Sequence, residues 1–152
     1  MANWNQRWID YARFIATWSK DRKKKVGAVI VDKHDTQVSH GWNGFPRKLN
    51  DNVDARHERP AKYKWCECAE RNAIYNAARK GHATEGCIMY VTYHPCAQCA
   101  RAIIQSGIEE VFTKEPNWNH ERWGEDFKIA KQMFEEVGVK VHYIQDSEES
   151  KN

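Results

Sequence analysis

Three cysteines and a glutamate stand in two short stretches whose spacing suits a metal ion. Cys96 and Cys99 are three residues apart in HPCAQCA, and Cys68 comes two residues before Glu70 in CECAERNAIYNAARKG. Residues three apart at the start of a helix share a face, and a helix N-terminus favours the thiolate over the thiol. Two helices that direct their first turns at one point could therefore hold a soft cation, and thiolate ligands favour zinc.

Glu70 is the group in this cluster that a purely structural metal site would not need. A catalytic zinc has three protein ligands and an open fourth position for water, whose pKa falls toward neutrality. A carboxylate beside that water can take a proton and pass it to a leaving group. The sequence therefore predicts a hydrolytic Zn²⁺ site with Cys68, Cys96 and Cys99 as ligands and Glu70 as the catalytic base.

Cys66 leaves a second interpretation open. Together with Cys68, Cys96 and Cys99 it could form a closed four-cysteine zinc site, and the protein would then be a metal-stapled binding module without chemistry. That alternative leaves Glu70 unexplained. A redox pair is a further alternative for the Cys-x-x-C motif.

The composition is that of one globular domain spanning 1–152. Of the 152 residues, 41% are hydrophobic and 30% charged, which is typical of a folded chain, and an acidic tail from about residue 146 is expected to be disordered. No apolar run approaches the roughly 20 residues that span a bilayer, and the N-terminus lacks the apolar core of a signal peptide. Five cysteines without a secretory signal favour a reducing compartment, so we expect a cytoplasmic protein with no membrane partner.

Hydrophobic periodicity predicts the elements that must position these groups. An amphipathic helix over about 4–18, whose tryptophans are expected in the core, precedes a hairpin over 26–31 and 36–43 and a polar loop over 44–65. A loop of this length usually serves as a lid or a binding loop. The remaining elements are a helix over 68–81, a strand over 87–92, a helix over 96–107, a strand over 109–113, a helix over 121–138 and a strand over 139–144. Alternating strands and helices imply an α/β layered domain, and the hairpin makes its sheet mixed.

These motifs resemble the cytidine/deoxycytidylate deaminase superfamily. Zinc nucleobase deaminases carry an H-x-E…P-C-x-x-C signature, and this chain has CAE at 68–70 and PCAQC at 95–99, with cysteine in place of histidine. SKD at 19–21, GWNGFPR at 41–47 and IIQSGIEEV at 103–111 are similar to bacterial and phage dCMP deaminases. The resemblance covers nearly the whole chain.

The resemblance implies a three-layer α/β/α cytidine-deaminase-like fold around a mixed sheet of about five strands. It also implies hydrolysis of dCMP to dUMP, the precursor for thymidylate synthesis, and ammonia. In that reaction a zinc-activated water attacks C4 of cytosine, while Glu70 moves protons to N3 and to the amine. The family is typically a homohexamer that dCTP with Mg²⁺ activates and dTTP inhibits, through an effector site associated with the long loop.

Further residues are expected around the nucleotide. By position in the family's motifs, Asn43 is expected at the sugar and Trp118 near the nucleotide. His94 is a candidate for the base pocket, with packing as the alternative role. The candidates for the phosphate are Ser19, Lys20 and Arg47. The basic run KDRKKK at 20–25 could be a phosphate site or a solvated turn.

The third thiolate departs from the usual signature. Three thiolates leave a zinc site with a net negative charge, whereas one histidine and two thiolates leave it neutral, so the bound water should be less acidic. The motif CAER also resembles three-cysteine cytidine deaminases, in which an arginine relieves this charge. We therefore expect Arg71 to compensate the thiolates, and a surface arginine is the alternative.

Two other substrate classes remain open within the deaminases. A tRNA or single-stranded nucleic-acid deaminase would need a positively charged groove with stacking aromatics. Seven tryptophans are compatible with it, but the net charge of +3 is mild, and we expect no stable nucleic-acid complex. A free-nucleoside deaminase is the other class, against which the basic run at 20–25 and Arg47 argue.

Overall fold

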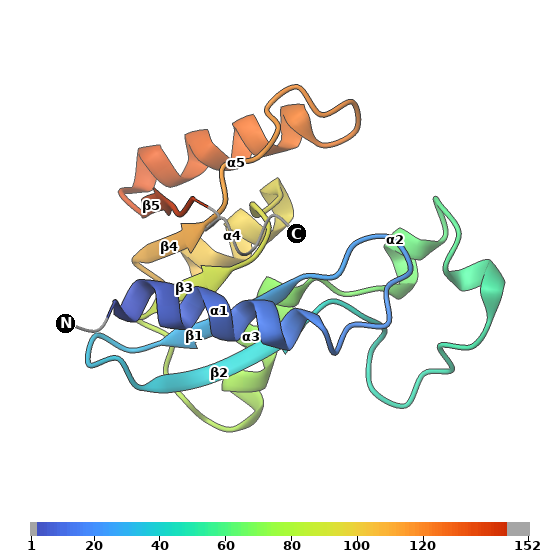
Figure 1. The fold of residues 1–152 in the computed structure, drawn as a ribbon, viewed down its shortest axis with the longest axis horizontal. Coiled ribbons are helices and arrows are strands. Elements are labelled where there is room, and N and C mark those ends of the chain that lie inside the picture. Colours follow the sequence, from blue (N-terminus) through green and yellow to red (C-terminus); the bar gives the residue numbers. More distant parts are fainter. Residues whose placement is uncertain (1–2, 146–152) are drawn as a thin grey trace.

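A five-stranded mixed sheet organises the computed structural model, which describes residues 3–145 (Figure 1). The strands are β1 (Gly27–Val31), β2 (Gln37–Trp42), β3 (Ile88–Val91), β4 (Glu110–Thr113) and β5 (Lys140–Tyr143). Their order in the sheet is β2-β1-β3-β4-β5. β1 is antiparallel to both β2 and β3, whereas β3, β4 and β5 are parallel to one another. The predicted hairpin and the predicted mixed sheet are both confirmed.

Helices cover both faces of this sheet. They are α1 (Trp4–Ala16), α2 (Lys62–Trp65), α3 (Ala69–Arg79), α4 (Ala97–Gln105) and α5 (Gly124–Val137), with a 3₁₀ turn at Asp54–Arg56. Figure 1 shows α1 in front of the sheet and α3 and α4 behind it. The buried layer under α1 consists of Ile9, Ala12, Ile15, Val29, Val31 and Tyr90. The layer on the other face includes Ala69 and Ala73 of α3, Ala100 and Ile103 of α4, and Ala130 and Phe134 of α5. The three layers of the expected fold are therefore present.

β1 is buried on both faces, which explains why its sequence is a continuous apolar run rather than an alternating one. Glycines let two helices lie close against the hairpin. A Cβ on Gly27 would lie 2.0 Å from the carbonyl oxygen of Ala12 in α1, and one on Gly41 would lie 2.4 Å from the backbone nitrogen of Ala73 in α3. Any other residue at these positions would push the helix away from the strand.

The prediction that the tryptophans of the 4–18 segment lie in the core was wrong for two of them. Trp4 and Trp18 are 46% and 45% exposed, and the smaller Ile9, Ala12 and Ile15 make the buried stripe. Hydrophobic spacing located the helix correctly, but it did not distinguish the buried face from the aromatic edge beside it.

The long loop after β2 leaves the sheet at one side and carries α2 (Figure 1). Its end returns to the domain through a two-way backbone bridge between Gly44 and Glu67, with N–O distances of 3.1 and 2.8 Å. The loop is therefore held at the point where α3 begins.

Within residues 3–145, no helix has both the length and the apolar character needed to cross a bilayer. The acidic tail predicted from about residue 146 lies outside the described residues.

Candidate active site

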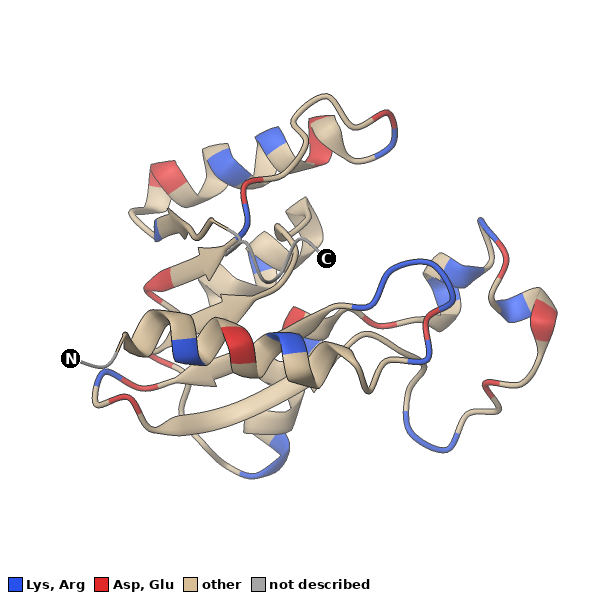
Figure 2. Ribbon diagram, in the orientation of Figure 1, with Lys and Arg blue, Asp and Glu red and all other residues tan. Residues whose placement is uncertain are grey.

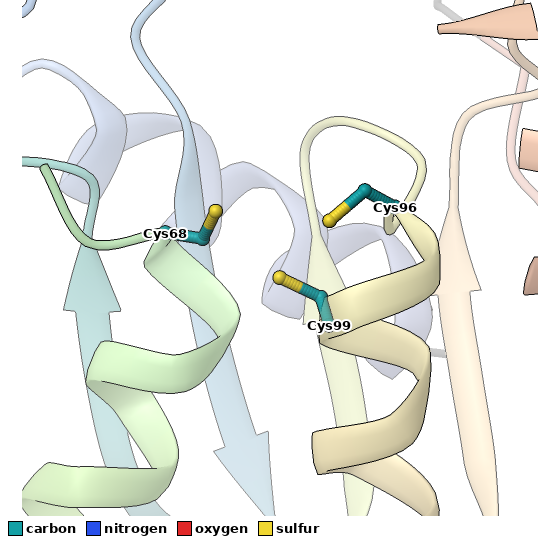
Figure 3. Close-up of side chains that lie close together, drawn as sticks. All are labelled: Cys68, Cys96 and Cys99. Atoms are coloured by element: carbon teal, nitrogen blue, oxygen red, sulfur yellow. The ribbon is translucent and has the colours of Figure 1, made fainter. Parts of the chain in front are cut away.

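Three thiols from the first turns of two helices form the centre of the site (Figure 3). Cys68 is the N-cap of α3, Cys96 is the N-cap of α4, and Cys99 lies in the first turn of α4. Their sulfur atoms lie within 4.8 Å of one another, and Figure 3 shows them directed into the space between the two helices. The structure thus brings together the three residues that the sequence predicted as metal ligands.

Hydrogen bonds among the three thiols give them different pKa values. Hydrogen bonds from the Cys68 and Cys99 thiols hold the pKa of Cys96 well below its usual range, and the Cys99 amide and Arg71 also favour the Cys96 thiolate. The same sulfur–sulfur hydrogen bonds raise the pKa of Cys68 and of Cys99. Zinc binds the thiolate form of cysteine, so metal binding would release the protons of these thiols.

Glu70 follows Cys68 in the first turn of α3 and is 5% exposed. Burial, together with the charge of Cys96, raises its pKa from 4.5 to about 7. A carboxyl group poised near neutrality can either hold or release a proton at physiological pH, as a general acid–base group must.

Arg71 lies against the thiols rather than on the outer surface. Its Nη2 is 3.7 Å from the Cys68 sulfur, and its Nε donates a hydrogen bond to Oε1 of Glu67. The side chain is only 12% exposed. Nη1 is buried and has no hydrogen-bond partner among the described residues.

Cys66 lies apart from the cluster although it lines the same cavity. In the described part of the chain, the group of sulfurs within 4.8 Å of one another contains Cys68, Cys96 and Cys99 but not Cys66. Burial and the nearby Asp21 carboxylate raise the pKa of Cys66 to about 11, so it remains a thiol at neutral pH. This placement favours an open three-cysteine site over the closed four-cysteine alternative.

A cavity of about 580 Å³ opens in front of the thiols and Glu70. Its walls come from the turn after α1, the long loop, the starts of α3 and α4, and the segment that leads into α5. The cationic side chains of the lining are Lys23, Lys24, Arg59, Lys62, Arg71 and Arg122, and its aromatic side chains are Tyr63, Tyr93, His94, His120, Trp123 and Phe127. Figure 2 shows the basic run after α1 and basic positions on the long loop. Such a cavity suits a flat ring attached to an anionic group.

Of the residues predicted around the nucleotide, Asn43 and His94 line this cavity and Trp118 does not. The Asn43 amide accepts a hydrogen bond from the Val26 nitrogen and donates one to the Lys24 carbonyl oxygen, each at 2.8 Å, so it also holds the chain that enters β1. Trp118 packs behind the cavity wall, edge-on to the ring of His94 at 5.4 Å.

His94 is 2% exposed, and burial lowers its pKa to about 4, so its imidazole is neutral at pH 7. Nδ1 lies 2.9 Å from the Pro95 carbonyl oxygen. Because a carbonyl only accepts, Nδ1 carries the proton.

The predicted phosphate contacts Ser19, Lys20 and Arg47 do not line the cavity, whereas Lys23 and Lys24 of the basic run at 20–25 do. Ser19 is buried and donates to the Asn43 carbonyl oxygen. Lys20 forms an exposed ion pair with Asp51, and Arg47 donates a hydrogen bond to the Asn76 side chain of α3. The cations that do face the cavity come from the turn at 23–24, the long loop and the segment before α5. Arg59 lies in the predicted polar loop and Arg122 at the start of the helix predicted over 121–138. Both are exposed, and no motif singled them out from the other cations.

The comparison with protein families places this site in a known context. A family model described as the cytidine and deoxycytidylate deaminase zinc-binding region matches residues 2–115. The chain belongs to this family. The matched region contains all three clustered cysteines as well as Glu70, so the candidate metal site lies within the zinc-binding region of the deaminase family.

Similar deaminases cover most of the chain. A protein of Aliivibrio fischeri named "Uncharacterized deaminase in luxG 3'region" is 40% identical over 95% of both chains. The human deoxycytidylate deaminase is 33% identical over 90% of this chain and 76% of the human protein. Among solved structures, the dCMP deaminase of cyanophage S-TIM5 in its apo form has a TM-score of 0.72 at 24% identity, covering 92% of this chain and 96% of the phage chain. This likeness shows that the protein has the cytidine-deaminase-like fold.

Proposed function

We propose that this protein is a zinc-dependent dCMP deaminase, which hydrolyses dCMP to dUMP and ammonia within one domain spanning 1–152. The observation that carries the proposal is a buried carboxyl group, Glu70, beside three thiols at the base of a cavity with cationic walls. Several similar proteins support the substrate, since the human relative is named deoxycytidylate deaminase. The S-TIM5 enzyme, which shares the fold, has been crystallised with dCMP and dUMP.

The donor set fits zinc. Three sulfur ligands within 4.8 Å of one another suit a soft, tetrahedral cation and do not suit magnesium or calcium. Cys68, Cys96 and Cys99 would hold the ion and leave one position open toward the cavity. When bound, zinc supplies a Lewis acid that makes water nucleophilic near neutral pH.

Glu70 is the group that moves the protons. It accepts a proton from the attacking water as the oxygen adds to C4 of cytosine. It delivers that proton to N3. It then takes the second proton from the new C4 hydroxyl and delivers it to the exocyclic amine, and the C4–N bond breaks to release ammonia. Because burial holds its pKa at about 7, Glu70 can accept and release protons at the same pH.

The remaining cavity residues bind the substrate. Tyr93 and Phe127 pack edge-on at 5.6 Å and, with neutral His94, offer apolar walls to the pyrimidine ring. Asn43, which lines the cavity, would contact the sugar. Arg59 and Arg122, which form no ion pair within residues 3–145, are placed for charge-assisted hydrogen bonds to the 5′-phosphate.

The proposal extends to the family's regulation, on the strength of the resemblance. The enzyme works in the cytoplasm as a homohexamer and serves pyrimidine metabolism. The nucleotide dCTP, with Mg²⁺, activates it, and dTTP inhibits it. Each effector must bind two states of the protein with different affinity, typically a coupling of about 1–3 kcal/mol. Rates that do not respond to a titration of either nucleotide would contradict this part.

One experiment tests the substrate. The purified protein is incubated with dCMP, deoxycytidine, dCTP, adenosine and a short cytosine-containing single strand, and ammonia and the deaminated base are measured. We expect dCMP to react fastest. A preference for the strand would instead favour a nucleic-acid deaminase, and zinc binding without any turnover would favour the binding module.

A further inference from the structure

Glu67 is a carboxylate beside the thiol cluster for which the proposed reaction has no use. It directly precedes Cys68, and its side chain is 26% exposed. A second acidic group next to several thiolates is electrostatically unfavourable unless it makes a compensating contact. The contacts of Glu67 show which group it serves.

The Glu67 carboxylate holds the guanidinium of Arg71. Its Oε1 accepts hydrogen bonds from Nε of Arg71 and, at 3.2 Å, from the backbone nitrogen of Cys68. The same guanidinium reaches the Cys68 sulfur through Nη2 at 3.7 Å. Arg71 thus bridges Glu67 and Cys68, and its planar group is held from two sides.

The backbone of Glu67 is itself fixed. It exchanges two hydrogen bonds with Gly44, the residue after Asn43 at the start of the long loop. A side chain that starts from a fixed backbone immediately before a helix has a restricted reach, and Arg71 lies one turn further along α3. Supports of this kind let an arginine keep one orientation near a metal site.

Arg71 needs such a support. Its side chain is long and flexible, it is mostly buried, and Nη1 has no hydrogen-bond partner in the described part of the chain. Without an acceptor at Nε, the guanidinium would lose its one strong partner and could turn away from Cys68 into the open cavity that it lines.

We propose that Glu67 is a positioning residue, which holds the Arg71 guanidinium against the Cys68 sulfur so that the negative charge of the third thiolate is balanced. This inference rests on the zinc site of the proposed function, but not on the identity of the substrate. Glu67 acts through its acceptor oxygen, because its own negative charge opposes the compensation that Arg71 provides. A neutral side chain with the same acceptor should therefore replace it.

The test measures zinc affinity by competition with a chromogenic chelator, which requires no turnover. The variants are Glu67→Ala, Glu67→Gln, Arg71→Met and the double variant Glu67→Ala/Arg71→Met, and the melting temperature of each metal-free protein checks its folding. We expect Glu67→Ala and Arg71→Met each to weaken zinc binding by about tenfold to a hundredfold, the range for lost outer partners of metal ligands. Glu67→Gln should remain within about threefold of wild type.

The double variant decides whether Glu67 acts through Arg71. If it does, Glu67→Ala should not weaken zinc binding any further in a protein that already carries Arg71→Met. Equal losses with and without the arginine would overturn the proposal, and so would a Glu67→Gln variant as weak as Glu67→Ala. A wild-type protein that binds zinc but deaminates nothing would contradict the proposed function and leave this test intact.

Discussion

The Asp21 carboxylate and the Lys62 ammonium lie 2.9 Å apart, in a salt bridge that joins the turn after α1 to α2 in the long loop. The Asp21 side chain is 5% exposed and also accepts hydrogen bonds from the backbone nitrogens of Lys23 and Lys24 at 2.8 and 2.9 Å. Burial alone would raise the pKa of Asp21, but these amides and Lys62 hold it below its usual value of 3.8. One carboxylate therefore orders the basic turn and fastens the loop that closes the cavity.

The first prediction concerns this salt bridge. Lys62→Met should lower the free energy of unfolding at pH 7 by about 1–3 kcal/mol, because Asp21 then loses a partner while it stays buried. Urea denaturation measures the difference. Since the folded-state pKa of Asp21 is lowered, its contribution is present above 3.8 and is lost as the pH falls through the folded value, so variant and wild type should converge in acid.

The matched control for Lys62→Met is Lys64→Met. Lys64 lies on the same short helix but is exposed and forms no ion pair with the described residues. If Lys64→Met lowers the free energy of unfolding as much as Lys62→Met does, then α2 tolerates no substitution and the salt bridge is not the cause.

The second prediction concerns the metal ligands. Cys68→Ser, Cys96→Ser and Cys99→Ser should each lose zinc, because a hydroxyl replaces a thiolate in a three-ligand site. Cys66→Ser should retain one zinc per chain, since Cys66 lies outside the sulfur cluster. Elemental analysis of the purified variants measures the zinc. Loss of metal from Cys66→Ser as complete as from the other three would restore the four-cysteine interpretation.

The third prediction concerns the variant Glu70→Gln. The amide keeps the size of the side chain but cannot take up a proton, so turnover of dCMP should fall by about 10²–10⁴. Zinc content and binding of dCMP should persist, which equilibrium binding and elemental analysis check. An active Glu70→Gln enzyme would remove Glu70 from the reaction.

The same substitution makes a fourth prediction about stability and pH in the metal-free protein. The pKa of Glu70 is about 7 in the folded protein and 4.5 is its ordinary value, so the folded state binds more protons between these values. Stability should therefore fall as the pH rises from 4.5 through 7, by roughly 3 kcal/mol from this group. Glu70→Gln should lack this component when the two proteins are compared by denaturation at each pH. Parallel curves would show that the carboxyl group titrates normally.

The sequence predicted the sheet, its flanking helices and the thiol cluster, because each depends on local patterns. Apolar runs identify strands such as β1 whatever surrounds them, and Cys96 and Cys99 share a helix turn by spacing alone. Cys68 could be added because its stretch also begins a helix, and parallel βα connections bring such helix starts to the same edge of a sheet.

The cavity wall was harder to predict because side-chain direction in loops depends on contacts that are distant in sequence. Asp21 turns the basic run so that Lys23 and Lys24 face the cavity, while Lys20 pairs with Asp51 on the outside. Arg59 is exposed in the long loop and lines the cavity, and no repeated pattern in the sequence marks it. Motif resemblance therefore located the cysteine cluster but not most of the cationic side chains that line the cavity.

The fifth prediction is that Arg59 and Arg122, rather than Lys20 and Arg47, select a nucleotide with a 5′-phosphate. The reacting ring is the same in dCMP and deoxycytidine, so discrimination must come from contacts to the phosphate. A charge-assisted hydrogen bond contributes about 1.5–3 kcal/mol, which corresponds to roughly a tenfold to 150-fold preference. Arg59→Ala and Arg122→Ala should each narrow the ratio of kcat/KM for dCMP over deoxycytidine by about this factor, with zinc content unchanged. Lys20→Ala and Arg47→Ala are the matched controls, since their side chains pair with Asp51 and Asn76 outside the cavity. An unchanged ratio in both cavity variants, or a loss confined to the two controls, would show that the phosphate is bound elsewhere.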